Sequence, residues 1–476
     1  MMDIGQFHSC QAPWVFETAT KSKSSRRTAN PFDGFESWTR SRKIKSINSV
    51  VKPNMPNLRD LRTLRSLKHR NFRLLLEGAL ISSSGDFMQN VAQSWLVWHV
   101  SNSPVAIGVI AFCDTLPRLL VGAVGGAIAD RFDRRRVLMI TQTAAMIQAI
   151  IYWLLVQFEV IELWHIAVLA FFLGIVNTIN QTSRQSLVNS LVPKEELLNA
   201  IGLQSSVFNF SKILGPSAGG LIIASVGIAG CFLVNAISFV FLLFNLYLME
   251  LPPWEKRKDE QNMWADVKEG FSYLLSNRRL LYIVGLSYVI ATFGAPYNRF
   301  VPIFATNVLH VGASGFGLLM SAPGVGATVA ALVLASVNKL RVGVRSICFS
   351  SLGFAVSLAL FAFSHNFVLS FLFLAMIGFC QISGRALSNT AIQTATPDNL
   401  LGRVLSLFFM DRGLWSLGSM LIGASGAAIG MDWTFAICGA VCAITAMTLL
   451  IVSRRYRAEL ARQRVDLSAI TQQSDL

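Results

Sequence analysis

Ionisable side chains interrupt several long apolar stretches of this chain, and they are the residues best placed to do chemistry. Asp86 lies within SSSGDFMQN, and Lys212 lies within FNFSKILGP. A charge at the centre of a bilayer is costly, so each such residue is a functional candidate that needs a partner. A carboxylate that can lose its cationic partner is a natural proton carrier, although a permanent structural ion pair explains the same residues. The candidates for proton coupling or buried charge are Asp86, Lys212, Asp114, Arg118, Asp411 and Arg412.

Polar residues that recur at helical spacing on the same stretches are candidates for lining a substrate cavity. Helical periodicity places each group partly on one face of its helix. Arg299 and Arg385 have no evident partner in the sequence, so they either attract an anionic substrate or cap helix ends. Hydrogen bonding between helices explains the amide side chains equally well. The cavity candidates are Gln89, Gln93, Asn177, Asn180, Arg299 and Arg385.

The elements that must position these residues are membrane-spanning helices. Of the 476 residues, 53% are hydrophobic and 14% are charged, whereas about 25% are charged in soluble domains. Runs long enough to span a bilayer alternate with short polar breaks from residue 72 onward, and they lack the alternation of barrel strands. We therefore predict an all-α membrane protein with twelve transmembrane helices in two pseudo-symmetric halves. The predicted spans are 72–99, 104–129, 137–158, 164–186, 198–224, 228–250, 280–305, 313–337, 344–364, 367–390, 403–428 and 432–453.

The breaks between the spans predict the orientation of the chain. Every second break is rich in lysine and arginine, and the others (SNSP, FEVIEL, VGIAG, LHVGA, FSHNF and GMDW) contain neither. Positive loops stay in the cytoplasm, so both termini are predicted to be cytoplasmic in a multi-pass protein of the cell membrane. The net charge of +15 is assigned to this bias rather than to nucleic-acid binding. The seven cysteines show no metal-ligand spacing, so no metal or cofactor is expected.

A repeat divides the chain into two halves. The stretch QSLVNSLVPKEELLNA matches NTAIQTATPDNLLGRV, with Pro193 and Pro397 in register, and such repeats are typical of secondary transporters. The predicted parts are a basic, disordered N-terminal arm at 1–70, a six-helix bundle at 71–250, a linker with an amphipathic helix at 251–279, a second bundle at 280–453 and a tail at 454–476.

The break after the second span reads GGAIADRFDRRRVL and resembles the corresponding loop of the major facilitator superfamily, Gly-x-x-x-Asp-Arg-x-Gly-x-Arg-Arg. Asp133 departs from this pattern, which prefers glycine there. The resemblance implies a cytoplasmic gate between the halves, and the alternative is a simple positive-inside signal. Arg184 is expected to support Asp130. The gate residues are Gly126, Asp130, Arg131, Arg135, Arg136 and Arg184.

The fifth span reads GLQSSVFNFSKILGPSAGG and looks like the antiporter signature of the same superfamily. Ser211 replaces one glycine of that signature with another small residue. The resemblance implies exchange across a closed helix interface, and the alternative is a generic small-residue packing face with a proline kink. The motif residues are Gly202, Gly215, Pro216, Gly219 and Gly220.

A finer resemblance covers nearly the whole membrane part. LKHRNFRLLLEGALISSSGDFMQNVAQSWLV and TPDNLLGRVLSLFFM look like the enterobactin-exporter and macrolide-efflux branch, also called the transmembrane secretion effector group. The resemblance implies export of siderophores or drugs in exchange for protons. Superfamily packing also implies that spans one, four, seven and ten line the cavity. It further implies the ion pairs Asp86–Lys212 and Arg118–Asp411.

The leading hypothesis is therefore a monomeric, proton-coupled exporter of a small amphipathic molecule that acts by alternating access. The chain contains no phosphate-binding loop of the Gly-x-x-x-x-Gly-Lys-Ser/Thr type and is predicted not to be an enzyme. An importer or facilitator on the same fold is the alternative, because a fold does not fix a function. A non-transporting sensor or scaffold is a third possibility, and buried charges at several depths argue against it.

Overall fold

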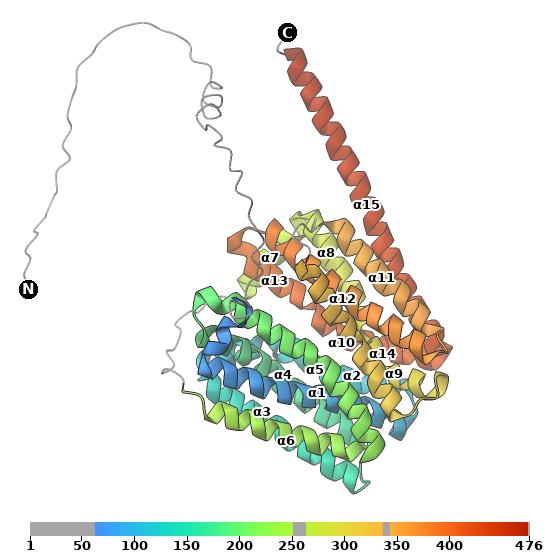
Figure 1. The fold of residues 1–476 in the computed structure, drawn as a ribbon. Coiled ribbons are helices and arrows are strands. Elements are labelled where there is room, and N and C mark those ends of the chain that lie inside the picture. Colours follow the sequence, from blue (N-terminus) through green and yellow to red (C-terminus); the bar gives the residue numbers. More distant parts are fainter. Residues whose placement is uncertain (1–61, 251–262, 337–342, 475–476) are drawn as a thin grey trace, which may run out of the picture. The chain divides into compact units, whose positions relative to one another are not determined.

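The computed structural model describes residues 62–250, 263–336 and 343–474. The predicted N-terminal arm up to residue 61 and the first part of the predicted linker, 251–262, lie outside the described residues. Two groups of helices follow one another along the chain (Figure 1). The first group consists of η2 (Arg62–Lys68), α1 (Arg70–Ser101), α2 (Pro104–Arg131), α3 (Arg134–Gln157), α4 (Leu163–Leu191), η3 (Lys194–Glu196), α5 (Leu197–Ser225) and α6 (Ile228–Tyr247).

The second group begins with the short helix α7 (Met263–Ser276), which packs against α13. Its seventh span is a composite of short segments, and the remaining spans are longer helices. These elements are α8 (Arg278–Val289), η4 (Ile290–Gly294), η5 (Ala295–Arg299), α9 (Val301–Ile303), η6 (Phe304–Val308), α10 (Ala313–Ser336), α11 (Val344–Ala362), α12 (Phe367–Ala395), α13 (Asp398–Phe409), α14 (Asp411–Ile429) and α15 (Met431–Ser474).

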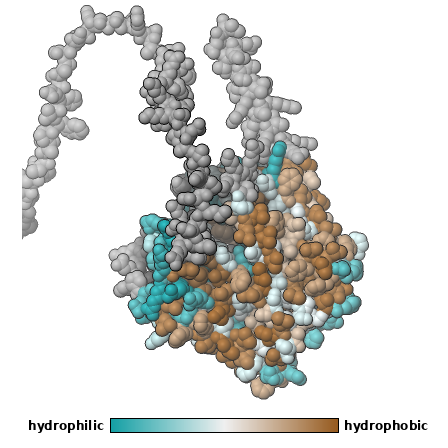
Figure 2. Space-filling view, viewed as in Figure 1, coloured by the Kyte–Doolittle hydropathy of each residue, from teal (hydrophilic) through white to brown (hydrophobic). Residues whose placement is uncertain are grey.

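Among the described residues, nine helices are long enough and apolar enough to cross a membrane. The helices α1, α2 and α14, which carry Asp86, Asp114 and Asp411, complete the set of predicted spans. Large apolar side chains face outward, including Ile140 at 69% and Leu332 at 67% exposure. Figure 2 shows a broad apolar surface on the visible face, with hydrophilic groups gathered toward its edges. Such a surface is unfavourable in water and fits a hydrocarbon environment.

Local sequence signals set the ends of several helices. The Asp133 side chain accepts a hydrogen bond from the Arg135 amide at the start of α3, and Asn366 caps α12 in the same way. Gly227 and Gly430 precede α6 and α15 with φ of +94° and +88°. Only glycine adopts these angles without strain, so the chain can reverse sharply there.

The helices α1–α6 form a first bundle, in which α1 packs against α5 and α6, and α3 packs against α4 and α6. In the second bundle, formed by α8–α15, α12 packs against α10 and α11, and α15 packs against α11. The two bundles meet where α2 packs against α14 and where α5 packs against α10. Two helix pairs therefore carry most of the interface between the bundles.

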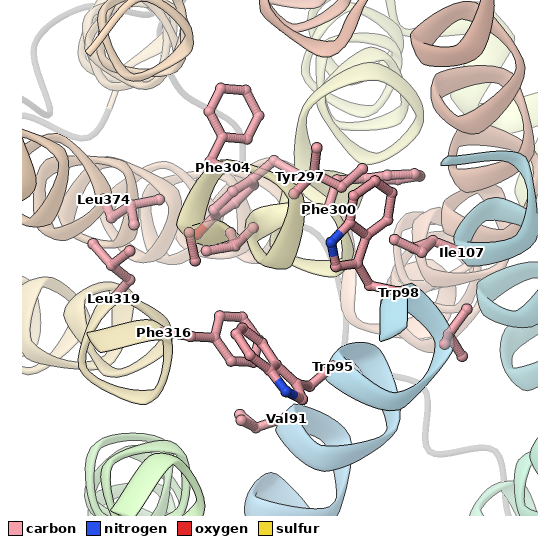
Figure 3. Packing of buried hydrophobic residues seen from close by; sticks show 14 of the residues in the cluster. Val91, Trp95, Trp98, Ile107, Tyr297, Phe300, Phe304, Phe316, Leu319 and Leu374 are labelled. Atoms are coloured by element: carbon pink, nitrogen blue, oxygen red, sulfur yellow. The ribbon is translucent and has the colours of Figure 1, made fainter. Parts of the chain in front are cut away.

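The two ends of the bundles differ in how they are packed. We call the end with the arginine-rich breaks the basic end, and the end whose breaks lack lysine and arginine the neutral end. At the neutral end one hydrophobic cluster joins residues of both bundles, including Trp95 and Trp98 of α1 and Phe316 of α10 (Figure 3). At the basic end each bundle has a hydrophobic cluster of its own.

The seventh span is irregular from its middle to its end. A π-helical turn at Ile290–Gly294 is followed by a 3₁₀ turn at Ala295–Arg299, and a second π-helical turn covers Phe304–Val308. Pro296 and Pro302 lie within this run and cannot donate backbone hydrogen bonds. Opposite it, Gly418 of α14 leaves room for Thr292 and Pro296. The irregular backbone therefore packs closely against α14 and sets the direction of Arg299.

Candidate substrate and coupling site

An ion pair between Asp114 of α2 and Arg299 of η5 connects the two bundles. The Asp114 side chain is 7% exposed, whereas the Arg299 side chain is 21% exposed. The Asp114 carboxylate is thus enclosed, while the Arg299 side chain is only partly covered. Sequence reasoning selected both residues and left Arg299 without a partner. The cross-bundle pair was missed because it depends on the unwound seventh span.

A second ion pair joins Arg385 of α12 to Asp411 of α14, with 3.2 Å between the guanidinium nitrogen and Asp411 Oδ1. Both residues belong to the second bundle. The predicted cross-bundle pair Arg118–Asp411 is therefore wrong for this structure, because Asp411 is held by Arg385. No hydrogen bond or ion pair reaches Arg118 within the part of the chain that the structure describes. The side chain of Arg412 lies outside the described residues.

Asp86 faces Arg184 of α4 and Asn235 of α6, which are its electrostatic and hydrogen-bonding neighbours. The predicted partner, Lys212 of α5, instead places its ammonium group 4.9 Å from the centre of the Phe208 ring. The reason is the rotation of α1. Its face toward α5 carries Phe87 and Met88, which pack on glycines of α5, so Asp86 points away from that helix.

The Nε atom of Arg184 is buried and has no hydrogen-bond partner among the described residues. Arg184 was predicted to support Asp130, whose side chain the structure does not describe. Its observed neighbour is Asp86. A buried donor without an acceptor is unfavourable, so Arg184 is incompletely satisfied in this position although Asp86 attracts it.

The amide side chains divide into an internal network and a set nearer the bundle interface. Gln89 donates to Gln148 Oε1 over 3.0 Å and accepts a bond from Asn235 Nδ2 over 2.8 Å. Because these partners lie on α3 and α6, Gln89 belongs to the core of the first bundle and not to a cavity between bundles. Asn180 likewise donates to Thr141 of α3 over 3.3 Å. Asn177 is partly exposed on α4.

Gln93 lies one helical turn beyond Gln89 and has a different environment. It borders a small pocket together with Ser94, Ala111 and Arg299. The side chain is 3% exposed, and its Nε2 group has no hydrogen-bond partner among the described residues. Of the predicted cavity residues, Gln93 and Arg299 are the two that this pocket brings together.

Aromatic side chains close the neutral end beyond this pocket. Trp95 stacks on Phe316 with 5.0 Å between ring centroids, and Trp98 donates to Thr306 Oγ1 over 2.9 Å. Figure 3 shows both tryptophans reaching from α1 toward elements of the second bundle. These contacts were not anticipated from the sequence, although two tryptophans three residues apart near a helix end are a visible signal.

The predicted gate motif is only partly described. Arg135 donates to the backbone carbonyl groups of Leu246 (2.9 Å) and Tyr247 (2.7 Å), which are at the end of α6. It therefore caps a helix of its own bundle, contrary to the expectation that it would connect the halves. Arg136 forms a long contact of 3.7 Å with Asp133. The side chains of Gly126, Asp130 and Arg131 lie outside the described residues.

The glycines of the fifth span serve two different interfaces. Gly215 and Gly219 pack on Met88 and its neighbours in α1, within the first bundle. Gly220 packs on Gly317 of α10, and Gly317 in turn touches the Pro216 carbonyl group. A methyl group at Gly202 would meet none of the described residues, so no packing role is evident for this glycine among them. The motif thus holds α5 close to both α1 and α10.

Comparison with known proteins identifies the fold and the family. The family model described as transmembrane secretion effector matches residues 62–470. The chain belongs to this family. It is therefore a membrane transporter of small molecules and not an enzyme. The prediction of the exporter branch of the major facilitator superfamily is confirmed.

Individual relatives are more distant. The chain is 27% identical over 388 residues to a staphyloferrin A transporter of Staphylococcus aureus, covering 81% of this chain and 96% of the relative. It is 26% identical over 373 residues to the enterobactin exporter EntS of Citrobacter koseri, covering 76% of this chain and 85% of the relative.

Solved structures show the same fold at low sequence identity. A POT family transporter in complex with 5-aminolevulinic acid has a TM-score of 0.67 at 12% identity, covering 81% of this chain and 96% of that one. The nucleoside transporter NupG has a TM-score of 0.65 at 14% identity, covering 80% and 98%. The predicted all-α membrane fold is confirmed.

Proposed function

We propose that this transporter exports an anionic, amphipathic small molecule of the siderophore type across the cytoplasmic membrane. A siderophore holds ferric iron through oxygen donors that ionise, so it carries negative charge when free of iron. The observation that carries the proposal is Arg299, a partly exposed arginine side chain that lines a small pocket between the bundles. Guanidinium groups bind carboxylates and similar oxyanions through paired hydrogen bonds.

The direction of transport is proposed from the packing of the two ends. Arginine-rich breaks mark the basic end as cytoplasmic under the positive-inside rule. The neutral end is closed by the shared aromatic cluster, so a substrate would approach the pocket from the cytoplasm. This is the state in which an exporter takes up its cargo. The relative whose name is enterobactin exporter supports the same direction.

Proton exchange is the proposed energy source, and Asp86 is the proposed proton carrier. Its carboxyl group lies mid-way along α1, beside Arg184 and Asn235. Protonation would remove its attraction to Arg184, which would then be free to adopt another position. We propose a monomer as the functional unit, because the spans of one chain complete both bundles.

Uptake of labelled, iron-free staphyloferrin A and enterobactin into inverted membrane vesicles tests the proposal. Export predicts accumulation that depends on a pH gradient, acid inside, and that a protonophore collapses. Accumulation in right-side-out vesicles alone would identify an importer. If neither compound accumulates in either vesicle type, with the protein present in the membrane, the proposed substrate class is contradicted.

A further inference from the structure

The Asp114–Arg299 ion pair has a feature that a purely structural tie does not need. The Asp114 side chain is almost fully enclosed, whereas the Arg299 side chain is three times as exposed. Arginine carries five N–H donors in a planar fork, and one carboxylate satisfies at most part of them. Asp114 therefore leaves donors of Arg299 unused, and Arg299 is also one of the residues that line the small pocket.

The pocket beside Arg299 contains a second donor with no partner. Gln93 Nε2 is buried and makes no hydrogen bond to any residue that the structure describes. A buried amide donor without an acceptor is unfavourable, so such a group usually meets a ligand or water. The remaining wall is apolar, formed by Val97, Ile107 and Ile110. Two N–H donors in an apolar setting match a carboxylate or another oxyanion.

We propose that Arg299 and Gln93 bind an oxyanion group of the substrate, and that this group takes Arg299 away from Asp114. The inference rests on the proposed function, because it requires an anionic substrate. Asp114 and the substrate compete for one guanidinium group. Since Asp114 belongs to the first bundle and Arg299 to the second, occupancy of the pocket loosens the neutral end where those bundles are joined.

The competition has a thermodynamic consequence. If substrate binding weakens the tie, then weakening the tie must strengthen substrate binding by the same factor. Replacing Asp114 by asparagine keeps its shape and removes its charge, so it should raise affinity rather than lower it. If Asp114 contacted the substrate directly, the same replacement would lower the affinity. If Asp114 only stabilised the fold, the affinity of the folded protein would not rise.

The test uses the full chain in lipid nanodiscs, with iron-free staphyloferrin A and iron-free enterobactin as probes. Asp114→Asn is expected to tighten binding about tenfold, which corresponds to the loss of one charge-assisted hydrogen bond. Arg299→Gln is expected to weaken binding by a similar factor, and Gln93→Leu several-fold. Arg299→Lys retains the charge and should retain part of the affinity.

Two matched variants serve as controls. Glu269→Gln removes the carboxylate from the Arg403–Glu269 pair, which lies away from the pocket. Gln142→Leu removes another buried glutamine with an unpartnered amide atom, on α3. Neither control is expected to change affinity for the probes. All variants are compared only after size-exclusion profiles match that of the wild type.

A distance measurement completes the test in a protein whose pocket residues are all unchanged. Spin labels at positions 105 and 429, which are exposed near the neutral ends of α2 and α14, report the distance between the bundles. Saturating probe should lengthen this distance. Binding with no lengthening, and equal affinity of Asp114→Asn and wild type, would overturn the inference and leave the proposed function intact. Failure of the wild type to bind either probe would overturn both.

Discussion

The indole Nε1 of Trp98 donates a hydrogen bond of 2.9 Å to the hydroxyl group of Thr306, so the first span is tied to the π-helical end of the seventh. The Thr306 hydroxyl group itself donates to the Pro302 carbonyl group, 2.9 Å away. Trp98 is 7% exposed. The bond is therefore shielded, and it links the two bundles at the neutral end.

Trp98→Phe removes this bond while keeping most of the aromatic packing. A neutral hydrogen bond contributes about 1 kcal/mol, so the open state of the neutral end should gain about fivefold in population. Spin labels at positions 100 and 307 would detect the change as a longer distance component. Trp164→Phe is the control, because Trp164 bonds only to Glu162 of its own bundle in the described structure. Equal distance distributions for both variants would contradict a closing role for Trp98.

Gly220 and Gly317 allow α5 and α10 to touch through their backbones at the neutral end. A side chain added to either glycine would meet the backbone of the other helix. We expect Gly220→Val and Gly317→Val to shift the transporter toward the state open at the neutral end, and to reduce transport strongly.

The control for these glycine variants is Gly202→Ala on the same helix. A methyl group there meets no neighbour in the part of the chain that the structure describes, and alanine favours a helix over glycine by about 1 kcal/mol. Gly202→Ala should therefore transport normally with a slightly higher Tm. Cysteine accessibility from the outside of the cell distinguishes the two kinds of variant. Unchanged accessibility in Gly220→Val would show that this contact does not limit opening.

The hydrogen bonds that join Gln89, Gln148 and Asn235 are expected to stabilise the first bundle without contacting the substrate. Asn235→Ala leaves Gln89 Oε1 without its donor, at a cost of about 1–2 kcal/mol for hydrogen bonds between membrane helices. Thermal unfolding in detergent should show a lower Tm, with substrate affinity preserved in the folded fraction. Ser225→Ala, which removes only local bonds to the carbonyl groups of Leu221 and Ile222 on the same helix, should leave the Tm unchanged.

Asp86 and Arg184 predict a specific loss of coupling. Asp86→Asn removes the charge that Arg184 faces, so transport should continue down a substrate gradient but no longer respond to a pH gradient. Arg184→Gln should reduce coupling in the same assay. Uptake into inverted vesicles with imposed pH steps measures both effects. Uptake by Asp86→Asn that still responds fully to the pH gradient would exclude Asp86 as the carrier.

The sequence predicted the helices well because hydrophobic length is a one-dimensional property. It also selected Asp86, Asp114, Arg299 and Asp411 as buried charges, because charge in an apolar run is conspicuous. The ion-pair partners of these residues were not predicted correctly. Depth counting fixes the height of a residue along a helix but not the direction of its side chain, and α1 turns Asp86 away from Lys212.

The Asp114–Arg299 pair shows a second limit of the sequence. Regular helical geometry would not place Arg299 reliably, since the seventh span changes its hydrogen-bond pattern at Ile290, Ala295 and Phe304. The prolines at 296 and 302 signal irregularity without giving its form. The sequence also could not show that Gln89 lies in the core of the first bundle whereas Gln93 lines the pocket, because this depends on which neighbouring helix each side chain meets.

The mixed turns of the seventh span have a consequence for how this helix can bend. In a regular helix, a sharp bend breaks backbone hydrogen bonds, which is expensive inside a membrane. Where turns with bonds to the third and fifth neighbours already alternate, a carbonyl group can exchange one amide partner for an adjacent one. The segment from Ile290 to Val308 can thus change its angle while keeping nearly the same number of backbone bonds. The segment can therefore act as a hinge, and Arg299 lies in the middle of it.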